Sequence, residues 1–387
     1  MAVSAQKDRL GKRTLLLHAL RKHPGASRAH LVRELQISIG TVRLLTESLV
    51  EAGLLVEQGV NLRTGGRPAT RLAINASGGL VLGVDLAEVD LRLALYDLAG
   101  NLVESTRTAI RSEGGVADVD RVVDEVVAMA RSAGGRLRGI GLAVPGQLDL
   151  SQGEVIYSAN LGWRGIALRE RLLTATGVPV IVERNSAAGM HAELWWGDHH
   201  AHEVSVYVTM GSGVGASIRR GQDLFGGETG MAGELGHIVV DPDGPACQCG
   251  QNGCLETYAS IRAIQARFDA LRGLTEPQTD LLAALKSGDL LALETVRAAG
   301  QYLAAALTSL VNLLNPGLII LSGQLMADTE HVVEEVERVV RERALPSSAR
   351  DVHVVASKLG DQGILLGAAT LVLDAIYQGA LTDVMSA

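Results

Sequence analysis

The chain has 387 residues, enough for two or three domains, and 47% of them are hydrophobic against 20% charged. This balance excludes a collagen-like or disordered chain. No apolar run reaches the roughly 18 residues that a membrane-spanning helix needs, and no signal-peptide core follows the basic N-terminal segment. The sequence therefore predicts a globular cytoplasmic protein whose cores are aliphatic, since only 3% of its residues are aromatic.

The net charge of −8 conceals two regions of opposite sign. Residues 1–75 carry 12 Lys and Arg against 5 Asp and Glu, whereas the remainder carries 23 against 38. A basic segment on an acidic body is typical of a nucleic-acid-binding arm. A merely solvated basic surface would give the same charge balance. The choice between these two interpretations therefore rests on the sequence pattern within residues 1–75.

Residues 1–76 have the pattern of a winged helix-turn-helix domain. Apolar spacing and capping residues predict helices over three stretches: 15–23, 28–35 after the cap Ser27, and about 39–52 after the cap Ser38. Val42, Leu45 and Leu49 fall on one face of the third helix and should pack against the other two. Arg43 and its neighbours near the start of this helix would then point outward, with Thr41 at the same end.

Two short strands are predicted after the third helix, over 54–57 and 69–74, and they flank the basic tip Arg63-Thr64-Gly65-Gly66-Arg67-Pro68. In a winged helix the third helix enters the major groove, while a wing arginine reaches phosphates or the minor groove. We therefore expect operator DNA to contact Ser38, Thr41, Arg43, Arg63 and Arg67. A helical oligomerisation domain is the alternative, and it leaves the glycine-rich basic tip unexplained.

Residues 77–387 carry two sets of strands and helices, which predict an α/β body of two lobes. The first set comprises strands over 80–86, 91–96 and 102–108, a helix over 116–133 and a buried strand over 137–144. The second comprises strands over 203–208, 213–219 and 238–240, helices from about 255 to 313, a strand over 318–321 and a final helix over 360–376. This order is that of an actin-like, ribonuclease H-like fold. We expect one lobe over 77–185 with the C-terminal helix, another over 186–360, and a small-molecule cleft between them.

All three cysteines lie within eight residues, in the pattern His237-x9-Cys247-x-Cys249-x4-Cys254. Three thiolates and one imidazole complete a tetrahedral zinc site with no open position, which favours a structural role over a hydrolytic one. Gly250 and Gly253 permit the tight loop that such a metal knuckle needs. Three unrelated buried cysteines are the alternative. A second glycine-rich turn, 211–215, follows an expected strand and is either a phosphate cradle or a plain tight turn.

These motifs together resemble the repressor branch of the ROK family, which is named for repressors, open reading frames and sugar kinases. The most specific matches are Gly-Glu-Leu-Gly-His at 233–237, the cysteine segment 247–256, and Gly-Gly-Arg-Pro at 65–68. Further matches lie at 27–54, 144–146, 160–163 and 313–316. The resemblance covers essentially the whole chain. It implies a two-lobed actin-like body that binds a sugar in its cleft and assembles into a homodimer or homotetramer.

The resemblance also implies roles for individual residues at matching positions. Sugar hydroxyls would bind the side chains of Asn160, Asn185, Glu234, His237 and Glu256. Structural zinc would be held by His237, Cys247, Cys249 and Cys254. Carboxylates suit this purpose because charge-assisted hydrogen bonds to hydroxyls are strong and fix orientation. In the alternative interpretation, Glu234 and Glu256 are ordinary surface charges.

The sequence departs from the family's sugar kinases at two motifs. Their catalytic Asp is matched here by Asn185, and an amide has no usable basicity at neutral pH. Their phosphate motif Asp-x-Gly-Gly-Thr-Lys is matched by Asp85-Leu86-Ala87-Glu88-Val89-Asp90, which lacks both glycines and the lysine. Because carboxylates at these positions would repel a triphosphate, we expect no kinase activity.

The sequence thus favours a sugar-responsive DNA-binding regulator, a repressor of carbohydrate-utilisation genes that a sugar in the cleft releases or modulates. The sugar would act through its differential affinity for two arrangements of the protein. An ATP-dependent sugar kinase that also binds DNA is one alternative, and a constitutive DNA-binding protein with a decayed sugar pocket is another. The sugar itself stays open, because xylose, glucose and N-acetylglucosamine would all use the same carboxylates.

Overall fold

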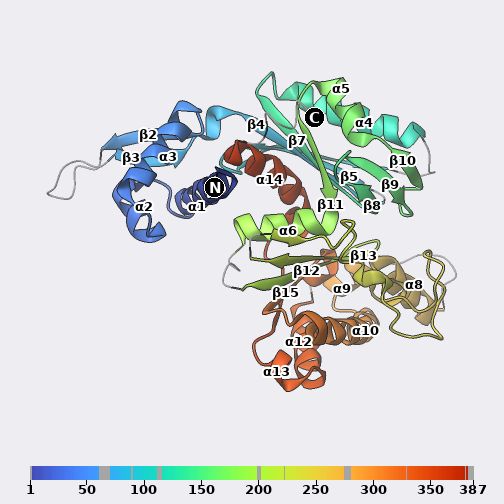
Figure 1. Ribbon diagram of the computed structural model, residues 1–387. Helices are drawn as coiled ribbons and strands as arrows, with labels where there is room; N and C mark the ends of the chain where they lie inside the picture. The colour runs from blue at the N-terminus through green and yellow to red at the C-terminus, as the bar shows by residue number, and fades with distance from the viewer. Residues whose placement is uncertain are drawn as a thin grey trace.

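The computed structural model describes residues 2–60, 70–88, 90–110, 116–197, 202–221, 223–273, 280–327, 329–379 and 381. A head of helices and short strands lies beside a body of two α/β lobes, as Figure 1 shows. In the part of the chain that is described, no helix combines the length and the apolar character needed to cross a membrane.

The head is a three-helix unit with a small antiparallel sheet. Its elements are α1 (Ala2–Lys22), β1 (Ala26–Ser27), α2 (Arg28–Leu35), α3 (Ile39–Glu51), β2 (Leu55–Val60) and β3 (Thr70–Ile74). The strands pair in the order β1-β3-β2, so the winged arrangement is confirmed. Helix α1 begins far earlier than the expected residue 15. The polar stretch 2–14 contains no proline and continues the helix toward the N-terminus. The wing tip with Arg63 and Arg67 lies outside the described residues.

Local signals explain the head helices. Ser27 and Ser38 cap α2 and α3 by accepting hydrogen bonds from backbone N–H groups, at 3.2 Å and 3.1 Å. Val42, Leu45 and Leu49 are buried on the inner face of α3, as their spacing predicts. The sequence pattern therefore sets both the start of the third helix and the face that it presents outward.

The first lobe is a five-stranded sheet with helices on both faces. Its strands are β4 (Leu80–Leu86), β5 (Asp90–Asp97), β6 (Leu102–Ala109), β7 (Leu137–Val144) and β11 (Val180–Arg184), in the order β11-β7-β4-β5-β6. The 3-10 turn η1 (Ala76–Gly78) precedes it, and helices α4 (Val116–Ser132) and α5 (Leu168–Thr176) cover one face. A small sheet of β8 (Gln147–Asp149), β9 (Glu154–Ser158) and β10 (Trp163–Ile166) extends it.

The second lobe repeats this plan. Its strands are β12 (Val204–Met210), β13 (Val214–Arg220), β14 (Asp223–Phe225), β15 (Leu318–Ser322) and β16 (His353–Ala356), in the order β14-β13-β12-β15-β16. The helical elements are α6 (Asn185–Trp196), η2 (Leu235–His237), α7 (Glu256–Ala259), α8 (Ile261–Leu271), α9 (Leu281–Lys286), α10 (Leu290–Leu314), α11 (Gln324–Ala327), α12 (Glu330–Arg343) and α13 (Pro346–Ala349). After η3 (Gly360–Gln362), α14 (Gly363–Gln378) returns to the first lobe and packs on β4 and β7.

The expected strand over 238–240 is wrong. The third strand of this lobe is β14, and the segment 238–240 instead follows the 3-10 turn η2, where Val239 makes only an isolated bridge to Cys254. Ile238 and Val239 are 41% and 45% exposed. The segment is drawn out of the sheet because it pairs with the cysteine loop, and a short apolar run cannot reveal such a partner.

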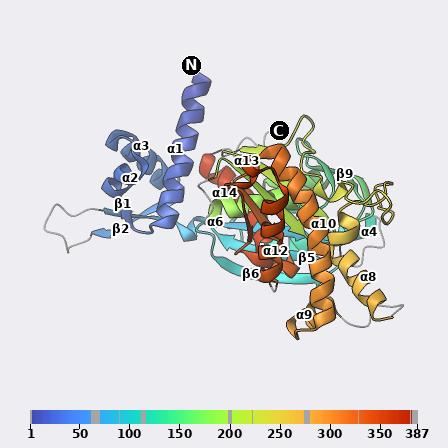
Figure 2. The same ribbon diagram turned by 90° about the horizontal axis from the view of Figure 1, so that it is seen from below.

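Helices α6 and α14 lie against each other at the centre of the molecule, between the head and the two lobes (Figures 1 and 2). They approach backbone to backbone, since a Cβ atom added to Gly367 would stand 1.9 Å from the Ala188 carbonyl oxygen. One hydrophobic core continues from the head into these helices. Its large members are Leu16, Leu17, Leu20, Leu31, Leu49, Leu72, Trp195, Leu373 and Tyr377.

Candidate functional sites in the head and between the lobes

The start of α3 is the exposed surface of the head that the DNA-binding hypothesis singles out. Ile39 and Leu44 are 58% and 57% exposed, and the Arg43 side chain is 71% exposed. Arg43 Nε donates a hydrogen bond to Glu47 Oε1 at 2.8 Å, and this bond raises the pKa of the guanidinium. A long basic side chain, paired with Glu47 and near two exposed apolar residues, is therefore accessible to a partner.

The two hydroxyl residues of this surface hold each other. Ser38 Oγ accepts a bond from the Thr41 backbone N–H and lies 2.8 Å from Thr41 Oγ1. Sequence reasoning missed a third polar group behind them, Arg28, which donates to Thr46 Oγ1 at 2.8 Å and to Glu57 Oε1 at 2.7 Å. Arg28 thereby joins α2, α3 and β2, and no local spacing signals contacts this distant in sequence.

Between the lobes, the glycine turn 211–215 brings Asn160 and Glu256 together. Asn160, in the loop between β9 and β10, donates to Ser212 Oγ at 3.4 Å across the lobe junction. Glu256, the first residue of α7, accepts a bond from the Val214 backbone N–H at 3.0 Å. A Cβ atom on Gly213 would stand 2.5 Å from Glu256 Oε2 and 3.5 Å from Asn160 Nδ2. This glycine is therefore needed for space, and the turn positions a carboxylate next to an amide.

Asn185 begins α6 beside the β4–β5 hairpin of the first lobe. Its Nδ2 donates to the Leu86 carbonyl oxygen at 3.2 Å and lies 3.4 Å from Asp85 Oδ1. Its Oδ1 is buried and has no hydrogen-bond partner among the described atoms. The preceding Arg184 donates to the Ala232 carbonyl oxygen at 2.7 Å and so ties the first lobe to the segment that leads into η2.

Glu234 precedes the turn η2 and His237 is its last residue, and both are exposed. The turn is held against β13 because the Ala216 N–H donates to the Gly233 carbonyl oxygen at 2.9 Å. Gly233 has φ of +104°, and a Cβ atom there would stand 2.2 Å from the Ala216 carbonyl oxygen, so only glycine fits. The turn thus presents Glu234 and His237 on the same short segment of the second lobe.

His237, Cys247, Cys249 and Cys254 form one cluster that could hold a metal ion. Cys247 Sγ lies 3.7 Å from His237 Nδ1, and Cys249 Sγ lies 3.6 Å from Cys254 Sγ. Tetrahedral zinc with bonds of 2.0–2.3 Å separates its ligand atoms by about 3.3–3.8 Å, so the donor set fits. Burial raises the pKa of the Cys254 thiol to about 12.

The backbone of the cysteine loop explains how it closes. Gly250 and Gly253 have φ values of +92° and +67°, which an L side chain rarely adopts. A Cβ atom on Gly253 would stand 1.5 Å from the Asp241 carbonyl oxygen, and the Cys247 N–H closes the loop on the Gln251 carbonyl oxygen at 2.7 Å. The glycine positions expected from the sequence are therefore those that the loop requires.

Charged pairs occupy the positions matched to the kinases' phosphate motif. Asp85 is buried and forms an ion pair with Arg92, which faces it directly in the β4–β5 register. Glu88 Oε1 lies 4.0 Å from Arg262 Nη1 of α8, in the other lobe. Sequence reasoning missed both arginines. Counting outward from the hairpin turn would have found Arg92, because the register pairs residue 85 with residue 92.

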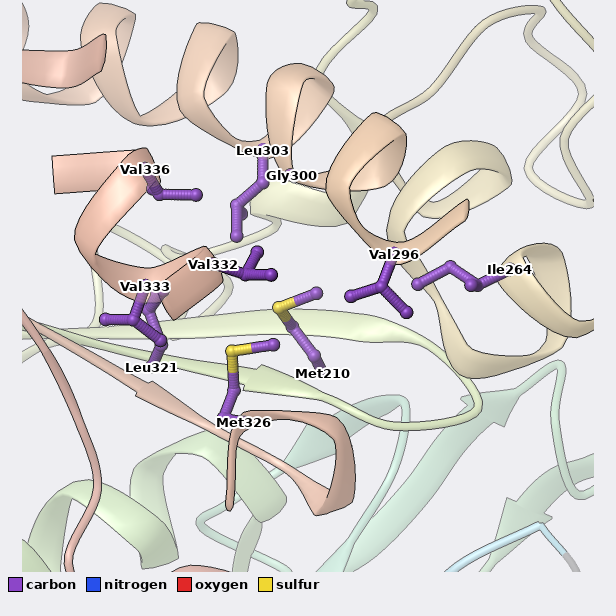
Figure 3. A pocket seen from close by; sticks show the side chains of 10 residues that line it. All are labelled: Met210, Ile264, Val296, Gly300, Leu303, Leu321, Met326, Val332, Val333 and Val336. Carbon is purple, nitrogen blue, oxygen red and sulfur yellow. The ribbon is translucent and has the colours of Figure 1, made fainter. Parts of the chain in front are cut away.

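A cavity of about 10 Å³ lies inside the second lobe, away from these residues. Figure 3 shows the Met210 and Met326 side chains extending into it. Its other lining residues are Ile264, Val296, Gly300, Leu303, Leu321, Val332, Val333 and Val336. A void of this size without polar groups holds no ordered water and no sugar, so it is a packing defect of the core.

Comparisons with known proteins give the chain relatives of two kinds. It is 28% identical to the xylose repressor of Bacillus subtilis, over 93% of this chain and 94% of that protein. It is 30% identical to the glucokinase of Thermotoga maritima, over 76% of this chain and 98% of that protein. The crystal structure of a ROK family transcriptional regulator, a homologue of the Escherichia coli Mlc protein, matches with a TM-score of 0.80 at 28% identity, covering 99% of this chain and 100% of that one.

These matches agree with the architecture. The repressor and the regulator extend over the head and both lobes, whereas the glucokinase match leaves about a quarter of the chain uncovered. The model of the ROK family matches residues 81–375, which include both lobes and the cysteine loop. The chain belongs to the ROK family.

Proposed function

We propose that the protein is a sugar-responsive transcriptional repressor of carbohydrate-utilisation genes. Its winged head would bind operator DNA, and a sugar bound between the lobes would alter that binding. The xylose repressor named above supports this proposal, because it is similar over the head as well as over the body. The observation that carries the proposal furthest is the continuous core that joins the head to the helix starting at Asn185.

Helix α6 offers a physical route between the two sites. It begins at Asn185 beside the expected sugar position and ends at Trp195 and Trp196, about 16 Å away at 1.5 Å per residue. The Trp195 ring contacts His18 of α1 in a tilted arrangement, with ring centroids 4.4 Å apart. The guanidinium of Arg21, also in α1, lies over the Trp196 ring at 4.6 Å. A shift at the start of α6 would therefore move aromatic side chains that support the head.

The packing of α6 on α14 favours the transmission of a displacement along α6 to the head over its dissipation by side-chain rearrangement. The two helices touch through Gly367 and the Ala188 carbonyl, so no flexible side chain separates them there. Trp196 Nε1 donates to Thr370 Oγ1 of α14 at 2.8 Å, and Trp195 stacks on Tyr377 at 5.5 Å. Because packed interfaces tend to switch between discrete arrangements, such a contact can convert a small displacement into a reorientation of the head.

For the sugar we assign hydrogen bonds to Asn160, Asn185, Glu234, His237 and Glu256. The unpartnered Oδ1 of Asn185 supports its role, since a buried acceptor gains from a hydroxyl donor. The geometry of Glu256 supports its own assignment, because the hydrogen bond from the Val214 N–H to one carboxylate oxygen orients the group. The same contacts suit xylose, glucose and N-acetylglucosamine.

For the metal we assign a structural Zn²⁺ to His237, Cys247, Cys249 and Cys254. Bound zinc would fix the cysteine loop and the turn η2, and so position Glu234 and the imidazole of His237. Four protein ligands leave no open coordination position, so the ion would take no part in a reaction.

For DNA we assign base or phosphate contacts to Ser38, Thr41, Arg43, Arg63 and Arg67. A homodimer or homotetramer would present two heads to a two-fold symmetric operator. The exposed Arg43 between Ile39 and Leu44 supports major-groove insertion of α3. We assign no kinase activity, because Asn185 offers no usable base and the segment 85–90 lacks the glycines and the lysine of the phosphate motif. Two carboxylates of this segment instead pair with Arg92 and Arg262.

The proposal is tested by combining a sugar panel with operator selection. Operator sites are selected from random DNA with the purified protein, and sugars are screened by thermal shift, where ligand at 100 times its Kd stabilises by roughly 2.7 kcal/mol. We expect one sugar class to stabilise the protein and to change operator affinity about 5- to 150-fold. Glu256→Gln should abolish both sugar effects and keep sugar-free operator binding.

Glu203→Gln is the matched control, since Glu203 lies at a distant exposed pair with Arg220. It should behave like the parent protein. ATP-dependent turnover of the stabilising sugar at rates near 1 s⁻¹ would replace the repressor with the kinase alternative. Operator binding that no stabilising sugar alters would favour a constitutive DNA-binding protein.

A further inference from the structure

Three metal-binding side chains converge where α1 meets α2, far from the cysteine loop. His23 follows the last turn of α1, and His30 and Glu34 lie one turn apart on α2. His23 Nε2 is 3.2 Å from Glu34 Oε1, and His30 Nε2 is 2.9 Å from Glu34 Oε2. The two imidazole rings meet edge to face with centroids 5.1 Å apart. The proposed function makes no use of this cluster.

The geometry is that of a ligand set as well as of a hydrogen-bonded trio. A neutral imidazole pairs with a carboxylate through one N–H, and here two imidazoles aim the same nitrogen, Nε2, at one carboxylate. Ligands bound to zinc at 2.0–2.1 Å stand about 3.3 Å apart. The 3.2 Å separation matches this value, and the 2.9 Å separation would have to lengthen slightly when an ion binds. Two histidines and a carboxylate with an open position form a donor set for zinc, nickel and related divalent transition ions.

The backbone already holds these ligands in place. The His23 N–H donates to the Ala19 carbonyl oxygen at 2.8 Å, and the His23 carbonyl oxygen accepts from the Ala26 N–H at 3.1 Å. His30 and Glu34 share a face of α2, where residues four apart are neighbours. The His23, His30 and Glu34 side chains are 43%, 41% and 28% exposed, so an ion can enter from solvent with little rearrangement.

We propose that His23, His30 and Glu34 form a second metal site, which binds a divalent transition ion and clamps α2 to the end of α1. Helix α1 packs on α14 of the body and contacts α6 through His18 and Arg21, while α2 packs on α3. The clamp would therefore stiffen the connection between body and recognition helix independently of the sugar.

The test is zinc binding to the full chain after the cysteine site has been filled. Because the sequence also carries adjacent histidines at 199 and 200, every variant is made in a His199→Gln, His200→Gln background. Isothermal titration with ZnCl₂ should then give about one further equivalent per chain. Its affinity should fall about tenfold or more in His30→Gln and in Glu34→Gln. His30→Gln keeps a hydrogen-bond donor toward Glu34, so the fold should survive.

His353→Gln is the matched control. His353 lies 3.6 Å from Glu337 in an exposed pair, and its ring is 6.2 Å from that of His202. Among the described residues these three side chains do not converge as His23, His30 and Glu34 do, so the loss of His353 should leave the titration unchanged. Co²⁺ added to the zinc-filled protein should give weak visible absorption without a thiolate charge-transfer band. A thiolate band, the absence of the further equivalent in the background protein, or equal zinc affinity in His30→Gln would overturn the proposal.

A second measurement addresses the clamp itself. Amide hydrogen exchange over residues 24–35 should slow on zinc addition in the background protein and remain unchanged in His30→Gln. Equal slowing in both proteins would contradict a role for these side chains, and unchanged exchange in both would show that a bound ion does not clamp the helices.

Discussion

Asp85 and Arg92 are the residue-scale basis of our proposal that the protein has no kinase activity. The hairpin register sets them face to face, and the buried carboxylate of Asp85 is paired with a guanidinium. Asn185 completes the arrangement by donating toward the same Asp85 carboxylate. The neutral amide of Asn185 fits beside the Asp85–Arg92 pair, whose charges cancel. A carboxylate at position 185 would add an uncompensated negative charge.

Asn185→Asp therefore should not create a kinase. It would place a second carboxylate about where Nδ2 now lies, 3.4 Å from Asp85 Oδ1, and like charges that close are unfavourable. We expect no ATP turnover in a coupled ADP-release assay and a loss of about 1–3 kcal/mol in unfolding free energy at pH 7. The loss should shrink toward pH 4 as one carboxyl becomes protonated. Sugar phosphorylation by this variant would show that the phosphate site is intact.

The cysteine loop makes a second prediction at this scale. Cys249→Ser removes one of four expected ligands, so metal analysis should find the zinc content reduced from about one per chain to near zero, with a lower thermal midpoint. Gly250→Ala is the control, because it keeps all four ligands and changes only a residue with φ of +92°. It should cost about 1 kcal/mol and retain the zinc. A stable, zinc-free parent protein would refute the metal assignment.

At the scale of elements, four of the five strands in the main sheet of the first lobe were predictable, whereas β11 and the contacts of α6 were not. Strands β4 and β7 have the residue bounds that the buried apolar runs indicate, because their partners lie nearby in a regular sheet. The strand predicted over 238–240 was wrong, since this segment pairs with the cysteine loop through Val239 and Cys254. The ring contact between His18 and Trp195 joins positions far apart in the chain, and no periodicity signals such a contact.

If α6 couples the sugar site to the head, removing a contact between α1 and the aromatic end of α6 should weaken the effect of the sugar on operator binding. Arg21→Ala removes the guanidinium over Trp196, and burial at this contact lowers the pKa of Arg21 to about 10. We expect the sugar to stabilise the variant as it does the parent, while the sugar-induced change in operator affinity falls severalfold. Arg164→Ala, which removes an equivalent cation–π contact over Tyr157 at 4.7 Å, should leave that change intact. Equal responses in the two variants would exclude α6 as the route.

Helix α14 carries a pH-dependent element. Burial raises the pKa of Asp374 from 3.8 to about 6, so between these values the folded state binds more protons than the unfolded state. Stability contributed by this group is therefore present below pH 4 and lost as the pH rises through 6. Asp374→Asn should raise the unfolding free energy by about 1–3 kcal/mol at pH 7.5 and have little effect near pH 4. Thermal midpoints across this range check it, and a pH-independent difference would contradict it.

At the scale of the whole molecule, the head is built into the body's core. Leu16 and Leu20 of α1 share a hydrophobic cluster with Trp195 and Tyr377, so the recognition helix rests on the same helices that border the lobe junction. The charge split of the sequence indicated a separate basic arm, and composition could not reveal how firmly it is attached. In the proposed function, this attachment is what would allow a sugar bound between the lobes to alter DNA binding.

The account is tested most directly by measuring sugar affinity on and off the operator. Linkage requires that the factor by which the sugar changes operator Kd equals the factor by which the operator changes sugar Kd. We predict the same factor, about 5- to 150-fold, from titrations of the sugar into the free protein and into its operator complex. An identical sugar Kd in the two titrations would contradict the central claim that one protein couples these two sites.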